Sequence, residues 1–134
     1  MGGRAVIVHD LPQALAALAA AARLNRPITL RTPYGAASCA GAGYFQKVAE
    51  LAKRQYPGVT AVFVLDCGDA AGQALGALRA GWKRIRFEGT AATLAKVADI
   101  AGQTGAVLDT DATPARDLSQ AEDPEKATAE WLEE

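Results

Sequence analysis

The sequence predicts an α/β fold built on a parallel sheet, because apolar runs recur at regular intervals and alanine-rich segments of helical period separate them. The expected strands are 5–8, 28–30, 61–65, 84–87 and 106–108, and the expected helices are 12–24, 43–55, 70–80 and 91–102. Glycine or proline follows most of these helices, as at Pro57, Gly81 and Gly105. Five parallel strands joined by four right-handed crossover helices therefore account for residues 1–111 as one domain.

The charges on the strands suggest which α/β fold this is. Side chains alternate across a strand, so Ile85 and Phe87 are expected on one side of the sheet. The opposite side then receives three charged side chains, Arg84, Arg86 and Glu88. Burying unpaired arginines under a helix costs several kcal/mol each, so this face is expected to carry no helix. The pattern predicts a partial (β/α)-barrel-like wall, and the alternative is a flavodoxin-like three-layer open sheet.

Residues 112–134 differ from the rest of the chain in charge. They hold two basic and seven acidic residues, whereas residues 1–111 hold 12 Lys or Arg against 8 Asp or Glu. Asp123 and Pro124 form a good helix start, and Trp131 follows at helical spacing. We therefore expect an acidic C-terminal tail with a short helix, lying on its own body, on a neighbouring subunit, or in solvent.

Composition excludes several classes of function. The net charge of −1 gives no electrostatic basis for binding nucleic acid. No apolar run approaches the roughly 18 residues of a membrane span. The two cysteines, Cys39 and Cys67, do not form a disulfide framework, which favours a reducing, cytoplasmic setting. No cofactor is expected, because no GxxxxGK[ST] sequence occurs and Gln46 stands where GxGxxG needs its third glycine.

A binding site is expected where the carboxyl ends of the strands meet. The residues at those ends are His9, Arg31, Asp66, Cys67, Asp69, Glu88 and Asp109. Arg31 and Arg86 would attract a small anion, with Asp66 and Asp69 on the same rim. Asp66 or Glu88 could transfer protons, and His9 could form an activated thiolate with Cys67 or Cys39.

The loop from Pro33 to Gly43 is the longest of the strand-end connections. Its small residues, Gly41 and Gly43 among them, precede a helix and would suit an anion, although a flexible connection or a lid is the commoner outcome. Cys39, Cys67 and His9 could ligate zinc together with Asp66 or Asp69, but no close spacing supports this and we predict no metal site.

Residues 5–33, which end in ITLRTP, and residues 83–102, which read KRIRFEGTAATLAKVADIAG, resemble two segments of the ketodeoxyphosphogluconate (KDPG) aldolase family, whose members are trimeric (β/α)-barrel lyases. The family's T-L-R-T element carries an arginine that contacts the substrate carboxylate, which implies that role for Arg31. Residues 83–102 are similar to the strand–helix unit in which an F-K-F element supplies the Schiff-base lysine. Here that position reads Arg86, and the general-base glutamate position reads Pro27. Arginine stays protonated and cannot form an imine, so the resemblance implies a degenerate lyase-like protein without Schiff-base chemistry.

Two functions follow as hypotheses. The first is a protein, with or without enzymatic activity, that binds a small anionic metabolite at the strand ends. The second is a non-catalytic homo-oligomeric assembly module, in which Arg84, Arg86 and Glu88 form ion pairs between chains. A homo-oligomer is expected in either case, because a polar open face and unpaired strand edges need covering.

Overall fold

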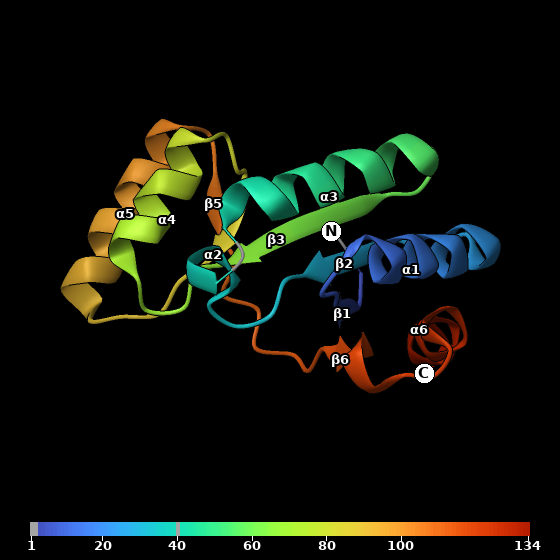
Figure 1. Ribbon diagram of the computed structural model, residues 1–134. Helices are drawn as coiled ribbons and strands as arrows, with labels where there is room; N and C mark the ends of the chain where they lie inside the picture. The colour runs from blue at the N-terminus through green and yellow to red at the C-terminus, as the bar shows by residue number, and fades with distance from the viewer. Residues whose placement is uncertain (1–2, 40) are drawn as a thin grey trace. The chain divides into compact units, whose positions relative to one another are not determined.

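A computed structural model describes residues 3–39 and 41–134, with Cys39 described by its backbone alone. The chain is an α/β protein, as predicted, with helices alternating with parallel strands (Figure 1). The strands are β1 (Ala5–Ile7), β2 (Ile28–Arg31), β3 (Ala61–Asp66), β4 (Arg84–Arg86), β5 (Val107–Leu108) and β6 (Arg116–Asp117). The helices are α1 (Leu11–Leu24), α2 (Ala36–Cys39), α3 (Ala42–Gln55), α4 (Ala71–Arg79), α5 (Ala91–Gln103), α6 (Pro124–Glu133) and the 3₁₀ turn η1 (Leu118–Gln120).

The strand order of the open sheet is β5-β4-β3-β2-β1-β6. The pairs β1–β2, β1–β6, β3–β4 and β4–β5 are all parallel. Strands β1 to β5 thus follow one another across the sheet in chain order, as they do in a barrel wall. A flavodoxin-like sheet has the order 2-1-3-4-5, so the alternative fold differs from the observed order.

The sheet has six strands among the described residues, whereas the sequence predicted five. The additional strand, β6, lies in the predicted tail and pairs Arg116 with Val6 and Asp117 with Ile7. Both residues of β6 are exposed and charged, so no apolar alternation marks this strand in the sequence.

Side chains alternate along β4 as the sequence predicted. Ile85 is fully buried, while its neighbours Arg84 and Arg86 remain partly exposed. In β2, Ile28 and Leu30 are buried and Thr29 is partly exposed, but Arg31 is also buried, with 8% of its surface exposed.

The described residues divide into two compact units. The first unit comprises residues 3–31, 47–63 and 113–134, and the second unit comprises 32–39, 41–46 and 64–112. Buried side chains from β1, α1, β2, η1 and α6 form the core of the first unit, among them Val6, Leu18, Leu30, Leu118 and Leu132.

Local signals in the sequence set the ends of α1. The Asp10 carboxylate accepts the Gln13 N–H at 2.9 Å, and Pro12 occupies the first turn. Asn25 ends the helix in the left-handed conformation with a φ of 53°, which asparagine tolerates better than most residues. Within the first unit, α6 packs beside α1 (Figure 1).

The C-terminal segment is built into the first unit. Helix α6 starts as predicted, with the Asp123 side chain accepting the Lys126 N–H at 3.1 Å and Pro124 at the first helical position. Trp131 Nε1 donates to the Ala5 carbonyl at 2.9 Å, so the tryptophan contacts β1 directly. The tail therefore lies on its own body, one of the arrangements that the sequence left open.

The second unit contains the end of β3, then β4 and β5, with α4 and α5 packed side by side (Figure 1). Its buried side chains come from β3, α4, β4 and α5: Val64, Leu65, Ala74, Leu78, Ile85 and Val97. Thr90 caps α5 by accepting the Thr93 N–H at 3.2 Å. The carboxyl ends of β3, β4 and β5 are thereby brought together within this unit.

Replacing Leu132 by alanine should lower the free energy of unfolding by about 2–5 kcal/mol, because Leu132 is only 3% exposed in the core of the first unit. Urea denaturation followed by circular dichroism measures the loss. Glu133→Ala, one residue further along α6 and exposed, is the control and should change stability by less than about 0.5 kcal/mol. A Leu132→Ala protein as stable as the wild type would show that α6 is a solvated arm.

Candidate functional site

The strand ends of the second unit surround a pocket of about 280 Å³. Its walls come from the residues that follow β2, from the carboxyl ends of β3 and β4, from the residues after β5 and from the start of α5. The lining residues are Tyr34, Asp66, Gly68, Arg86, Phe87, Glu88, Gly89, Leu94, Asp109 and Thr110.

Asp66 fixes two loops at this pocket. Its Oδ1 atom accepts the Gly68 N–H at 2.8 Å and the Gly35 N–H at 3.1 Å. Its own N–H donates to Thr32 Oγ1 at 2.8 Å. The carboxylate therefore joins the turn after β3 to the loop after β2.

Gly68 is required by the shape of this turn. Its φ is +57°, a left-handed conformation, and a Cβ atom at this position would lie 3.3 Å from both Tyr34 Cζ and Gly35 Cα. The absence of a side chain thus lets the Tyr34 ring lie directly on the backbone after β3. Residues 66–69, the Asp-Cys-Gly-Asp turn after β3, therefore support the Tyr34 ring and also supply carboxylates.

Arg86 contacts carboxylates on two sides. Its Nε atom lies 3.9 Å from Asp66 Oδ2, and its Nη1 atom lies 3.5 Å from Asp109 Oδ1. Nη1 also donates to the Asp111 carbonyl at 2.9 Å. The side chains of Arg86, Asp66 and Asp109 are 25%, 14% and 11% exposed, so water screens these contacts only in part.

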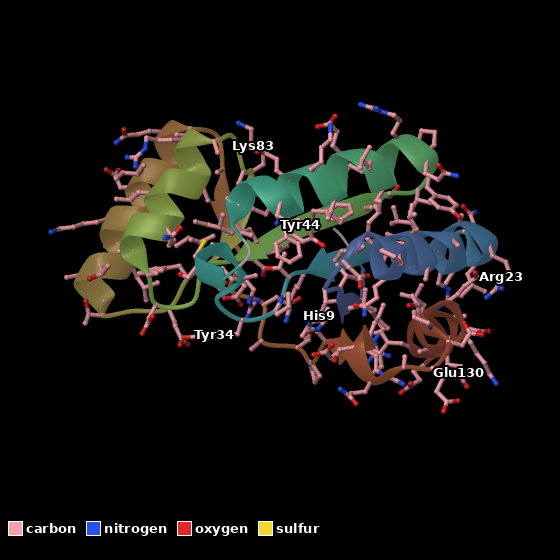
Figure 2. All side chains as sticks on the ribbon, viewed as in Figure 1. His9, Arg23, Tyr34, Tyr44, Lys83 and Glu130 are labelled. Carbon is pink, nitrogen blue, oxygen red and sulfur yellow. The ribbon has the colours of Figure 1, made fainter. Side chains whose placement is uncertain are left out.

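Tyr34 reaches the pocket from the loop after β2 (Figure 2) and donates a hydrogen bond from its hydroxyl to Glu88 Oε1. The pKa of Tyr34 is raised to about 12, mainly by this hydrogen bond. Partial desolvation of the hydroxyl and the negative charges of Glu88, Asp69 and Asp66 contribute in the same direction. The hydroxyl therefore stays protonated at neutral pH and acts as a donor toward Glu88.

Apolar surface completes the pocket. The Tyr34 and Phe87 rings and the Leu94 side chain line it beside the charged groups. Phe87 lies close to the backbone at Gly89, where a Cβ atom would be 3.1 Å from the phenylalanine ring. Aromatic faces next to carboxylates form an environment that suits an organic cation.

Cys67 is not placed as a nucleophile. Its side chain is 1% exposed, and burial, followed by the nearby charge of Asp66, raises the pKa of the thiol to about 12. The thiolate is the reactive form, so the structure does not favour the activated-thiolate hypothesis. The side chain of Cys39, the other thiol in that hypothesis, lies outside the described residues.

His9 and Arg31 belong to the first unit, whereas Asp66, Asp69 and Arg86 belong to the second. His9 follows β1 (Figure 2), and its Nε2 atom lies 2.8 Å from Asp117 Oδ1. Burial alone would raise the pKa of Asp117, but hydrogen bonds from Ser119 and His9 outweigh it, so the pKa lies below its usual value. The sequence predicted that Arg31, Asp66 and Asp69 lie on one rim at the strand ends, and this arrangement stays a prediction.

The loop from Pro33 to Gly43 contributes its first residues to the site. It contains α2, and Gly41 follows with a φ of +90° before α3 begins at Ala42. The residues around the pocket include Tyr34 but not Gly41, Gly43 or Asp69. Tyr34 was not among the residues predicted for the site, although its position two residues after a strand-end threonine was a usable signal.

Two further properties concern metals and membranes. Among the side chains that the structure describes, which do not include that of Cys39, no group of three His, Cys, Asp or Glu residues could hold a metal ion. None of the described helices is long and apolar enough to cross a membrane.

Cys67 should react with dithiobis(nitrobenzoate) only after unfolding. A thiol pKa of about 12 instead of 9.0 lowers the thiolate fraction at neutral pH by about a thousandfold, and burial also blocks the reagent. The measurement uses a Cys39→Ser protein, so that Cys67 alone is counted, in buffer and in concentrated urea. Equal reaction rates in the two solutions would show that the thiol is accessible and available for chemistry.

The chain matches no model of a known protein family. It is similar to none of the curated proteins with which it was compared. The resemblance of residues 5–33 and 83–102 to KDPG aldolases stays a prediction from the sequence.

Proposed function

We propose that the second unit binds a small organic cation, such as an alkyl- or arylammonium ion, in the pocket at its strand ends. One observation carries the proposal: the lining holds three carboxylates and a single cationic side chain, next to two aromatic rings. Asp66, Glu88 and Asp109 outnumber Arg86, so the lining carries a net negative charge at neutral pH. The aromatic faces add a cation–π attraction of about 0.5–2 kcal/mol.

A small anion was the ligand expected from the sequence, and the contacts of Arg86 make it the weaker candidate. The guanidinium lies within ion-pair distance of both Asp66 and Asp109 and also donates to a carbonyl. An anion would have to compete with these carboxylates and would meet Glu88 at the same pocket. Anion binding stays a prediction, and the experiment below distinguishes it from cation binding.

Proton transfer at this pocket would rest on Glu88 rather than Asp66. Asp66 Oδ1 is held by two backbone N–H groups, which gives this carboxylate a structural role in the turn. Glu88 is exposed and bonded to the Tyr34 hydroxyl, so it is accessible to a bound molecule. If the KDPG aldolase kinship holds, Arg86 at the lysine position supports a lyase-like protein without an imine.

Butylammonium or tetramethylammonium should raise the melting temperature of the protein by mass action, and inorganic phosphate at equal ionic strength should not. At a concentration of about 100 Kd, binding of the cation would add about 2.7 kcal/mol to stability. Glu88→Gln should reduce the increase, because it removes an exposed carboxylate from the lining and leaves the rest of the pocket intact. Differential scanning fluorimetry measures each shift.

Glu122→Gln is the matched control, since it removes one exposed carboxylate from the first unit. It should leave the response to the ammonium ions unchanged. If phosphate raises the melting temperature and neither ammonium ion does, the cation proposal is wrong and the pocket binds an anion instead.

The second candidate is the homo-oligomeric assembly module, which one observation favours. Val107 is 49% exposed on β5, a strand at the edge of the sheet, and an exposed apolar edge can pair with another chain. The expected interchain pairs are weaker, because Arg86 and Glu88 already have partners within the chain. The low cysteine content keeps a reducing, cytoplasmic setting as the expectation for either function.

If assembly uses β5, light scattering at micromolar concentration should give a mass of at least twice 13.9 kDa for the wild type. Val107→Glu should return the mass to that of one chain, because it places a charge at the apolar edge. Gln103→Glu, exposed on α5, adds the same charge away from β5 and should have no effect. A wild-type mass of 13.9 kDa would remove the assembly candidate.

A further inference from the structure

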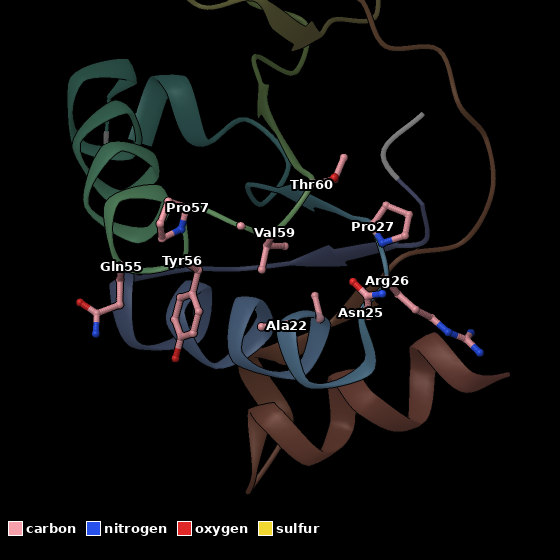
Figure 3. A pocket seen from close by; sticks show the side chains of 11 residues that line it. Ala22, Asn25, Arg26, Pro27, Gln55, Tyr56, Pro57, Val59 and Thr60 are labelled. Atoms are coloured by element: carbon pink, nitrogen blue, oxygen red, sulfur yellow. The ribbon is translucent and has the colours of Figure 1, made fainter.

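A second pocket, of about 400 Å³, lies in the first unit at the amino ends of β2 and β3 (Figure 3). It is bounded by the end of α1, the residues before β2, and the turn that joins α3 to β3. Neither the charged strand-end groups nor any residue of the second unit lines it. Its volume falls within the range of about 300–1,000 Å³ that is typical of small-molecule sites.

The walls of this pocket are mostly apolar. They include the Tyr56 ring, the Val59 side chain, the rings of Pro27 and Pro57, and the methyl group of Ala22 (Figure 3). Tyr56 and Val59 also pack against the core of the first unit, so contacts with the core fix the position of this apolar wall. A flat hydrophobic molecule could cover the aromatic ring and the adjacent aliphatic surface.

Polar groups occur at the edge of the pocket. Asn25 and Gln55 bring side-chain amides, each of which can donate and accept hydrogen bonds. Arg26 is the one charged residue among those that line the pocket, and its Nη1 atom donates to the Leu132 carbonyl in α6. Figure 3 shows the Arg26 side chain directed away from Tyr56 and Val59. The Arg26 guanidinium therefore interacts with α6 and does not point into the pocket.

The surroundings favour a neutral ligand over either kind of ion. Two helices, α1 and α3, end at the pocket, and the partial negative charge of a helix C-terminus disfavours an anion. The last turns of the same helices carry Arg23, Lys53 and Arg54, but none of them lines the pocket. Arg23 and Arg54 are also paired with Glu125 and Glu50. None of the described carboxylates lines the pocket to attract a cation, whereas the side-chain amide of Asn25 can bond a neutral molecule.

We infer that this pocket is a second binding site, for a small neutral molecule with a flat apolar ring and one hydrogen-bonding group, of the indole or phenol class. The ring would lie on Tyr56 and Val59, and its polar edge would reach the amide of Asn25 or Gln55. The site is independent of the cation pocket, because all of its residues belong to the first unit.

Indole is the probe, and its titration into ¹⁵N-labelled protein locates the site through amide shifts. We expect the largest shifts at Asn25, Tyr56 and Val59, with saturation below the solubility limit of indole. Tryptamine and indole-3-acetate carry the same ring with a positive and a negative charge. Each should bind at least about fivefold more weakly, which corresponds to roughly 1 kcal/mol.

Ala22→Leu tests the location without disturbing the core. Ala22 is exposed on α1, and leucine is also a good helix former, so the protein should fold while the larger side chain fills the pocket. Indole affinity should fall at least about tenfold. Ala98→Leu, an exposed alanine of α5 in the second unit, is the matched control and should bind indole as the wild type does.

Three outcomes would overturn the inference. The first is a lack of indole binding up to its solubility limit, and the second is equal affinity in the Ala22→Leu protein. The third is tighter binding of tryptamine or indole-3-acetate than of indole, which would show that charge rather than apolar surface selects the ligand.

Discussion

Burial of alanine on the helices is the constraint on which both units depend. The buried alanines of the described helices are Ala14, Ala17, Ala20 and Ala21 in α1, Ala36 and Ala37 in α2, Ala52 in α3, Ala74 and Ala77 in α4, Ala101 in α5, and Ala127 and Ala129 in α6. A methyl group lets helix axes approach closely, and an added methylene in such a contact costs about 1–3 kcal/mol. Alanine is also the best helix former, so the same residues favour the helices before any packing takes place. Larger side chains, such as Leu18 and Leu30, pack with these alanines in the core of the first unit.

The elements that could be predicted from the sequence are those with a local signal. Periodicity, together with the glycine or proline that follows most helices, located α1, α3, α4 and α5 to within a residue or two. In the structure Asp10 and Thr90 also cap α1 and α5 through contacts made inside one turn. Strand β6 could not be predicted, since Arg116 and Asp117 pair with β1 through backbone groups that every residue carries. The docking of α6 was one of several open arrangements because it depends on contacts with residues near the start of the chain, such as Ala5.

The position of the candidate pocket follows a general rule, whereas its chemistry does not. The rule that ligands bind at the carboxyl ends of parallel strands led to the prediction of a site near Asp66, Arg86 and Glu88, and the structure has a pocket lined by these residues. The sequence could not show that Arg86 would be paired with Asp66 and Asp109, because these contacts join three separate strands. Tyr34 was missed for a similar reason: its place depends on the conformation of a long loop and on the bare backbone at Gly68.

The pairing of β6 with β1 has a consequence for the order in which the chain folds. Val6 and Arg116 lie near opposite ends of the sequence, so this contact closes a very long loop, and such contacts form late because loop closure costs entropy. On the ribosome, the second unit has all of its residues once Ala112 has been added. The first unit must wait until Leu118 and Leu132 emerge before its core can close. Until then the apolar surface of α1 is uncovered, which leaves the nascent chain prone to aggregation until residues 118–132 have emerged.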